Sequence, residues 1–214
     1  MIGLLTAGGD LSRKKVFLSC YQKADLKIAV DSGSEYYYKY KKLPDLVLGD
    51  FDSISKEAYH YLSRNKIELK KFPPEKNATD LELGIDYLIS KGCEKVQVLG
   101  GIGNRVDHSL ANIFLLKKYF DQGIEIVLIN DLMELEMIKG RITVYNHYQY
   151  SSILPITDKG IKLSLKGFYY PLENYYYPFG STLGVSNYLV GDRGEIEIHE
   201  GLAILVKTNE KNRE

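Results

Sequence analysis

Several features that often signal a function are missing from this sequence of 214 residues. It has no tryptophan, and its two cysteines, Cys20 and Cys93, lack the spacing typical of metal centres or disulfide frameworks. Lysine plus arginine equals aspartate plus glutamate at 28 each, which leaves no excess of positive charge for a nucleic acid. Apolar runs are too short to span a membrane, and residues 1–5 lack the basic start of a signal peptide. We therefore expect a cytoplasmic protein with reduced thiols and with neither nucleic acid nor membrane as a partner.

The pattern of apolar residues changes about two-thirds of the way along the chain. Before the change, short apolar runs alternate with helical patterns. The runs lie at 2–6, 27–30, 46–48, 96–99 and 125–129, and the helical patterns lie around 13–21, 35–41, 56–65, 80–90 and 107–119. Such alternation predicts an α/β domain over residues 1–138 with a mostly parallel, Rossmann-like sheet.

From residue 139 onward the apolar residues recur with a period of two, notably at 141–144, 160–165, 195–199 and 202–206. This pattern predicts a small all-β sandwich domain over residues 139–214. A β domain of this size is at the lower limit for independent stability. We therefore expect it to pack on the first domain or on a partner chain.

Aspartates recur where apolar runs end in polar or glycine-rich turns, at Asp31, Asp50 with Asp52, Asp80 and Asp107. The carboxyl ends of parallel strands open onto the ligand crevice of an α/β sheet, so these carboxylates should converge. Two of them about 5 Å apart would repel by roughly 3 kcal/mol at an effective dielectric near 20. Magnesium relieves such repulsion and also binds phosphates. The pattern predicts a magnesium–nucleotide site.

Asp50 and Asp52 stand two residues apart, so at the end of an extended strand both would project to the same side and could reach one metal ion. A simple turn is the alternative, although two aspartates exceed what a turn needs. Asp80 follows Thr79, with Glu82 completing a capping box. The helix dipole alone would explain Asp80 equally well.

Two glycine-rich segments could approach an anion. In residues 100–105 the backbone amides are accessible and Arg105 adds a planar guanidinium for phosphate. Val106 occupies the third glycine position of a dinucleotide fingerprint, so that motif is absent. Gly8-Gly9 is a weaker second candidate. His108 is either a proton shuttle or, more commonly at a helix start, a solvated residue.

Taken in order, these strings resemble the bacterial type of thiamine pyrophosphokinase. The matching segments are Asp31-Ser32-Gly33, 44–54, 79–83 and 103–112, followed in the β region by 170–174 and 178–187. The resemblance extends from Asp31 to about residue 201. It departs at Ser34, where bacterial members usually carry glycine.

The resemblance implies an α/β domain, a C-terminal β-sandwich and a homodimer with sites between subunits. It implies transfer of pyrophosphate from ATP to the hydroxyl of thiamine, with Mg²⁺, giving thiamine diphosphate and AMP. The residues that it implies fall into four groups. They are Asp50, Asp52 and Asp80 for the metal; Gly33, Gly101, Gly103, Arg105 and Asp80 for the nucleotide; Asp31, Asp107 and Arg105 for catalysis; and Phe179, Ser186 and Asn187 for thiamine.

Two alternatives remain open at this point. The string around Asp50 and Asp52 also matches the nucleophile loop of haloacid-dehalogenase-type phosphatases, although that class places the loop after its first strand. The other alternative is a non-catalytic module that binds a nucleotide or a vitamin. The presence of aspartate at every acidic position of the motifs argues against a non-catalytic module.

Overall fold

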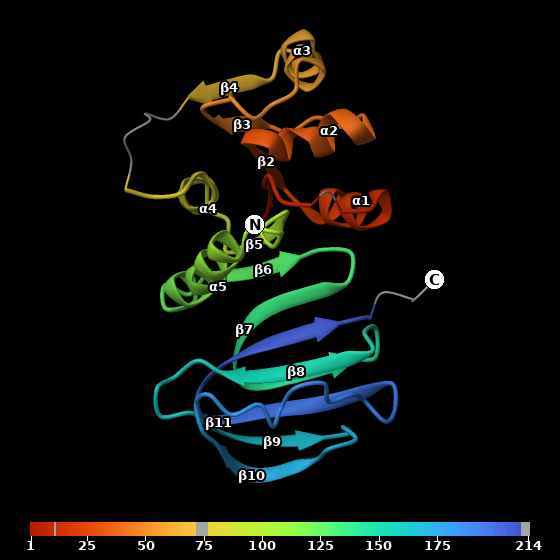
Figure 1. The fold of residues 1–214 in the computed structure, drawn as a ribbon, viewed down its shortest axis with the longest axis vertical. Coiled ribbons are helices and arrows are strands. Elements are labelled where there is room, and N and C mark those ends of the chain that lie inside the picture. The colour runs from red at the N-terminus through yellow and green to blue at the C-terminus, as the bar shows by residue number, and fades with distance from the viewer. Residues whose placement is uncertain (11, 72–76, 211–214) are drawn as a thin grey trace. The chain divides into compact units, whose positions relative to one another are not determined.

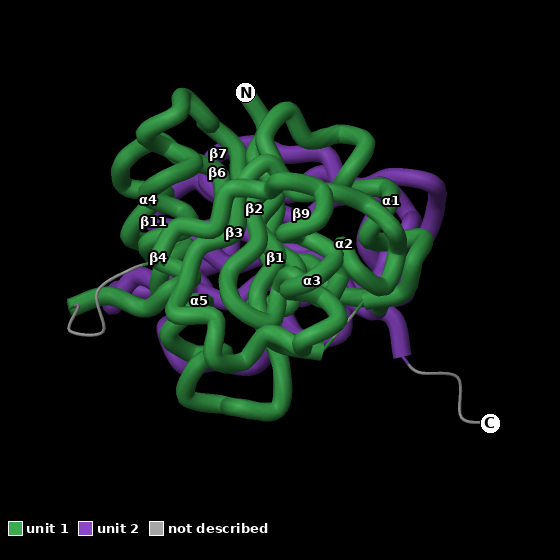
Figure 2. The backbone as a smooth tube through the Cα atoms, turned by 90° about the horizontal axis from the view of Figure 1, so that it is seen from above, with its two compact units in different colours: residues 1–131 green, residues 132–214 purple. Residues whose placement is uncertain are grey.

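The computed structural model describes residues 1–10, 12–71 and 77–210, and the chain forms two compact units, Met1–Asp131 and Leu132–Glu214 (Figure 2). The first unit is α/β and the second is built from strands, so the predicted fold class is confirmed. The sequence pattern placed the change after residue 138. The chain divides after Asp131, because the strand that begins at Met133 already pairs within the second unit.

A parallel sheet forms the centre of the first unit. Its strands are β1 (Ile2–Thr6), β2 (Leu26–Val30), β3 (Leu46–Gly49), β4 (Glu68–Lys71), β5 (Lys95–Leu99) and β6 (Glu125–Ile129). They lie in the order β6-β5-β1-β2-β3-β4, and each neighbouring pair is parallel. The helices are α1 (Lys14–Lys23), η1 (Asp31–Ser34, 3₁₀), α2 (Glu35–Tyr40), α3 (Lys56–Arg64), α4 (Asp80–Ser90) and α5 (Val106–Phe120).

Helices cover both faces of this sheet (Figure 1). Leu4 belongs to the buried cluster that α1, α2 and α3 form with one face. The next residue, Leu5, points the other way, where a Cβ on Gly84 of α4 would approach it to 2.8 Å. Because both faces are buried, strands such as β1 need apolar residues at consecutive positions, which explains the short apolar runs of the sequence.

The strand order reverses at one point of the sheet. From β1 the chain proceeds through β2 and β3 to β4 at one edge, then returns to place β5 on the other side of β1. Loops that leave two neighbouring strands in opposite directions open a crevice at their carboxyl ends. The ends of β1 and β5 therefore mark the expected ligand position.

The second unit consists of antiparallel strands around a core of its own. They are β7 (Met133–Tyr145), β8 (Tyr150–Pro155), β9 (Ile161–Lys166), β10 (Leu172–Tyr177) and β11 (Arg193–Thr208). The long β11 pairs with β7 along most of its length, with β9 over its first half and with β8 over its second half. Ile153, Leu163 and Ile196 are among the fully or almost fully buried residues of the core.

The predicted strands at 195–199 and 202–206 are one strand, β11. Its register shifts between Ile198 and Ala203, and Gly201 in this stretch has a φ of 86°. A glycine inside an apolar alternation is typical of such a bulge as well as of a turn, which is why the sequence pattern was misread.

Candidate active site

A cavity of about 630 Å³ lies in the first unit, at the carboxyl end of the sheet. This volume is within the usual range for pockets that bind small molecules. Its walls come from the loops after β1, β2, β3 and β5, from the start of α4 and from the first turns of α5. Among the lining residues are Gly8, Gly9, Asp10, Asp31, Ser32, Ser53, Thr79, Asp80, Gly101, Gly103, Arg105, His108, Ser109 and Asn112.

Two glycine-rich loops meet backbone to backbone at this cavity. The amide of Gly9 donates a 3.1 Å hydrogen bond to the carbonyl of Gly100, next to a 2.8 Å bond from Ala7 to Leu99. A Cβ on Gly9 would lie only 2.4 Å from the Gly100 oxygen, so a side chain there would separate the loops. The glycines of these two loops therefore give the cavity a stretch of bare backbone, as needed for close approach of an anion.

Helix α5 fixes the shape of the loop that precedes it. The Ser109 hydroxyl accepts a hydrogen bond from the amide of Gly103, and the buried Asn112 amide donates to the carbonyl of Gly101 at 2.7 Å. Ser109 and Asn112 are not among the site residues predicted from the sequence. Polar residues three apart on one helix face, directly after a glycine loop, were the signal that could have found them.

Asp31 stands at the end of β2 in the left-handed conformation, with a φ of 46°. Its carboxylate accepts a 3.2 Å hydrogen bond from the amide of Asp50, and a Cβ on Gly49 would come within 1.7 Å of it. Burial, and then the nearby charges of Asp80 and Asp50, raise the pKa of Asp31 to about 6. The Ser34 hydroxyl donates to the carbonyl of Asp31 and closes the turn.

The segment that carries Asp50 and Asp52 is a turn. Strand β3 ends at Gly49, Phe51 has a φ of 71°, and the amide of Asp52 donates to the carboxylate of Asp50 at 3.0 Å. Asp50 and Asp52 therefore do not lie on an extended strand end, contrary to what their spacing predicted. Both carboxylates are exposed, and Asp50 is the one whose charge acts on Asp31.

The carboxylates of Asp31, Asp50 and Asp80 give this edge of the sheet a local excess of negative charge. Within residues 1–10, 12–71 and 77–210, no group of three or more Asp, Glu, His or Cys side chains lies close enough together to hold a metal ion. These three carboxylates nevertheless supply the oxygen donors that suit a hard divalent cation, and their mutual repulsion contributes to the raised pKa of Asp31. The donor chemistry fits magnesium.

Arg105 and Asp107, both singled out from the sequence, contact each other. The guanidinium of Arg105 donates to the carboxylate at 2.6 Å and 3.3 Å, and both side chains are exposed. The hydrogen bond from Arg105 lowers the pKa of Asp107 to about 2. Asp107 is thus charged at neutral pH, and a phosphate that enters the cavity must compete with it for Arg105.

The remaining nucleotide residues predicted from the sequence have different surroundings. Asp80, Gly101 and Gly103 line the cavity. Gly33 instead lies buried against β1, where a Cβ would approach the carbonyl of Thr6 to 2.1 Å. Its lack of a side chain serves the packing of the turn on the sheet.

The residues predicted to bind thiamine lie in the second unit. Phe179 and Ser186 are exposed, whereas Asn187 is buried. The Asn187 side chain accepts hydrogen bonds from the amides of Tyr170 and Tyr188 and donates to the carbonyl of Tyr170. Asn187 therefore braces the neighbouring segment.

A doubly wound parallel sheet, with a cavity at its switch point lined by glycine loops, carboxylates and an arginine, defines the class of α/β nucleotide-binding enzymes. In the described ranges, none of the helices is long and apolar enough to cross a membrane.

Comparison with known proteins identifies the family. The model of the thiamin pyrophosphokinase catalytic domain matches residues 17–128, and that of the thiamin pyrophosphokinase vitamin B1 binding domain matches residues 139–203. Thiamine pyrophosphokinase from Bacillus subtilis is 32% identical over 209 residues, 96% of this chain and 98% of the relative. The chain belongs to the thiamine pyrophosphokinase family and is an enzyme, a transferase.

Solved structures from this family agree over nearly the whole chain. The thiamine pyrophosphokinase structure from Bacillus subtilis has a TM-score of 0.88 at 30% identity and covers 98% of this chain and 99% of its own. The structure from Geobacillus thermodenitrificans has a TM-score of 0.85 at 28% identity, with 99% of both chains covered.

Proposed function

We propose that the protein transfers a pyrophosphoryl group from ATP to the hydroxyl of thiamine, with Mg²⁺, and releases thiamine diphosphate and AMP. The observation that carries this proposal is the cavity at the switch point, where bare backbone, Arg105 and a group of carboxylates stand together in the unit that matches the catalytic domain. The nucleotide belongs in this cavity. Membership of the family supports the choice of thiamine as acceptor.

The phosphates of ATP would lie along the two glycine loops. Backbone amides there, together with the guanidinium of Arg105 released from Asp107, would offset the charge that develops on the leaving phosphate. Gly101 and Gly103 supply the accessible backbone, and Gly33 keeps the turn after β2 close to the sheet.

Asp50, Asp52 and Asp80 would hold the magnesium ion. When bound, the ion supplies positive charge that neutralises phosphate oxygens. The protein's own part is to present these carboxylates on short turns, and the contact of Asp31 with the Asp50 amide sets the position of that turn.

In the reaction, the hydroxyl oxygen of thiamine forms a bond to the β-phosphorus, and the bond from that phosphorus to the oxygen shared with the α-phosphate breaks. The electron pair leaves with AMP. The hydroxyl proton needs an acceptor, and Asp31 is the better placed of the two candidates, because it lines the cavity while Asp107 faces Arg105.

The second unit would bind thiamine, since residues 139–203 match the vitamin B1 binding domain. Exposed Phe179 can face the cationic, aromatic rings, and Ser186 can donate or accept a hydrogen bond. We also propose a homodimer in the cytoplasm with sites shared between subunits. Exposed apolar residues at four-residue spacing on α5, namely Val106, Leu110 and Phe114, support a buried interface.

Identification of the products tests this proposal. Incubation with thiamine, ATP and magnesium should give AMP and thiamine diphosphate in equal amounts. ADP with thiamine monophosphate would mean attack at the γ-phosphorus and would overturn the assignment. Release of phosphate from phosphate esters without ATP would instead indicate a phosphatase.

A further inference from the structure

The segment between β1 and α1 forms one wall of the cavity through Gly8, Gly9 and Asp10. It precedes the residues that match the catalytic domain, and two adjacent glycines have no side chains that could fix their backbone. The contact of Gly9 with Gly100 holds the inner side of this wall. Its outer side needs a second support, because free glycine backbone is costly to order.

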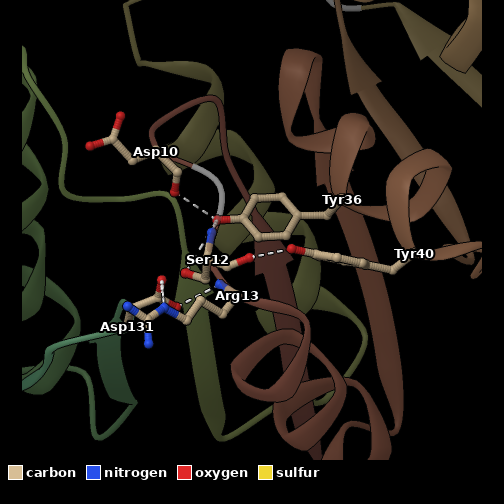
Figure 3. A network of polar contacts seen from close by, with 6 residues as sticks. All are labelled: Asp10, Ser12, Arg13, Tyr36, Tyr40 and Asp131. Carbon is tan, nitrogen blue, oxygen red and sulfur yellow. Dashed lines mark hydrogen bonds and ion pairs between the residues drawn. The ribbon is translucent and has the colours of Figure 1, made fainter.

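Two tyrosines of α2 supply this support (Figure 3). The hydroxyl of Tyr36 donates to the carbonyl of Asp10 at 3.0 Å and accepts a hydrogen bond from the amide of Ser12, also at 3.0 Å. The hydroxyl of Tyr40 donates to the carbonyl of Ser12 at 2.6 Å. The backbone on both sides of residue 11 is therefore bound to side chains of one helix.

The two tyrosine rings are themselves fixed in the core. Tyr36 is fully buried, and its ring stacks on Phe17 of α1 with a centroid separation of 5.6 Å. The ring of Tyr40, four residues further along α2, lies 5.2 Å from Phe17. Because Tyr36 is buried, Tyr40 is partly buried and both rings pack against Phe17, their hydroxyls are held in defined positions.

The far end of the segment is anchored separately. The carboxylate of Asp131 accepts a 2.6 Å hydrogen bond from the amide of Arg13, and the Arg13 side chain lies 3.6 Å from it (Figure 3). The tyrosines therefore bind the backbone at Asp10 and Ser12, between this anchor and the Gly9 contact, and Asp10 itself lines the cavity.

We propose that Tyr36, assisted by Tyr40, is a positioning residue for the phosphates of ATP. It contacts the wall from behind and holds the Gly8-Gly9 amides where the phosphate chain passes. This inference rests on the proposed function of the cavity. Loss of the Tyr36 hydroxyl would leave the Ser12 amide, which is buried, without its partner, so the wall would shift or become disordered.

The test compares Tyr36→Phe and Tyr40→Phe with Tyr21→Phe. Tyr21 also contacts Phe17 and donates its hydroxyl to a backbone carbonyl, that of Leu43, but does not bind the cavity wall. Calorimetry with Mg-ATP in the absence of thiamine should show a Kd about 5- to 20-fold higher for Tyr36→Phe. The KM for ATP should rise in parallel, while kcat and the KM for thiamine stay within about twofold. Tyr21→Phe should match the wild type.

An unchanged Kd and KM for ATP in Tyr36→Phe would overturn the inference. So would a fall in kcat and melting temperature without a change in ATP affinity, because that pattern describes a purely structural residue. If Tyr36→Phe does not fold, Tyr40→Phe tests the inference instead, and its Kd for Mg-ATP should be about 2- to 5-fold higher than that of the wild type. Wild-type protein that binds no ATP would refute the proposed function itself.

Discussion

At the scale of single residues, the position of Asp31 depends on the absence of a side chain at Gly49. Gly49 has a φ of 140°, and a Cβ there would lie 1.7 Å from the Asp31 carboxylate. A contact this short cannot be absorbed without moving Asp31 or the turn before Asp50. The constraint joins the ends of β2 and β3, the two neighbouring strands that carry these aspartates.

We therefore expect Gly49→Ala to lower the free energy of unfolding by about 2–4 kcal/mol and to abolish most activity. Gly92→Ala is the control, since Gly92 has a φ of 89° but open space around the missing Cβ. Gly92→Ala should lower the free energy of unfolding by only about 1–2 kcal/mol, through backbone strain alone. Urea denaturation measures the free energy of unfolding of the two variants, and steady-state assays measure their activity. Equal costs for the two variants would show that contact with Asp31 is unimportant.

At the scale of secondary-structure elements, a partly buried ion cluster joins β7 to β11. The ammonium of Lys207 lies 2.7 Å from Glu134 and 2.9 Å from Glu136, and all three side chains are mostly shielded from water. Burial acts to lower the pKa of Lys207, but the two carboxylates outweigh it and raise the pKa above 10.5. Lys207 is thus charged at neutral pH.

Lys207→Gln should cost about 3 kcal/mol, because it leaves two partly buried carboxylates without a cation. Lys95→Gln, which breaks the more exposed pair with Glu125, should cost less than about 1 kcal/mol. Since the folded-state pKa of Lys207 is raised, its contribution is complete below pH 10.5 and is lost as the pH rises through the folded value. The difference in the free energy of unfolding between wild type and Lys207→Gln should therefore stay constant up to pH 10.5 and shrink above it in urea titrations. A difference that stays constant well above pH 10.5 would argue against the ion cluster.

Elements with strong local signals could be predicted from the sequence, and the others could not. Helix α4 begins and ends where its capping residue and apolar spacing indicated, and the Thr79 hydroxyl accepts from the Glu82 amide. Strand β4 carries charged residues suited to a sheet edge, and β10 exposes most of its tyrosines, so neither shows apolar alternation. Their pairing with neighbours, which is a tertiary effect, decides their conformation.

At the scale of the whole molecule, the cavity was predictable in part. Aspartates at strand ends indicate a convergent site because parallel strands end at one edge, and Asp31, Asp80 and Arg105 do line the cavity. The pairing of Arg105 with Asp107 and the bracing by Asn187 depend on side-chain geometry, which spacing does not encode. Residues within the motifs that resemble the family can thus stabilise the fold as well as contribute to a binding site.

The proposed shared site can be tested by mixing chains. An Asp50→Asn chain and a Phe179→Ala/Ser186→Ala chain should each be nearly inactive, and these changes avoid the structural Asn187. After subunit exchange in equal amounts, about half of the dimers would be mixed, each with one intact site. Activity should then recover to roughly a quarter of the wild-type value. Absence of recovery after verified exchange, or a monomer in sedimentation at working concentration, would contradict the shared site.

The central place of β1 has a consequence for how the chain is made. Gly3 is opposite Leu26 on one side and opposite Val96 on the other, so β1, which is synthesised before both of its partners, waits for β5 to complete its pairing. Until then β1 is an apolar edge strand, a kind of surface that favours association with other chains. During this interval the cavity also lacks the wall that the loop after β5 forms. If the proposed nucleotide site is correct, we expect nucleotide to stabilise the chain fully only after synthesis has passed α5.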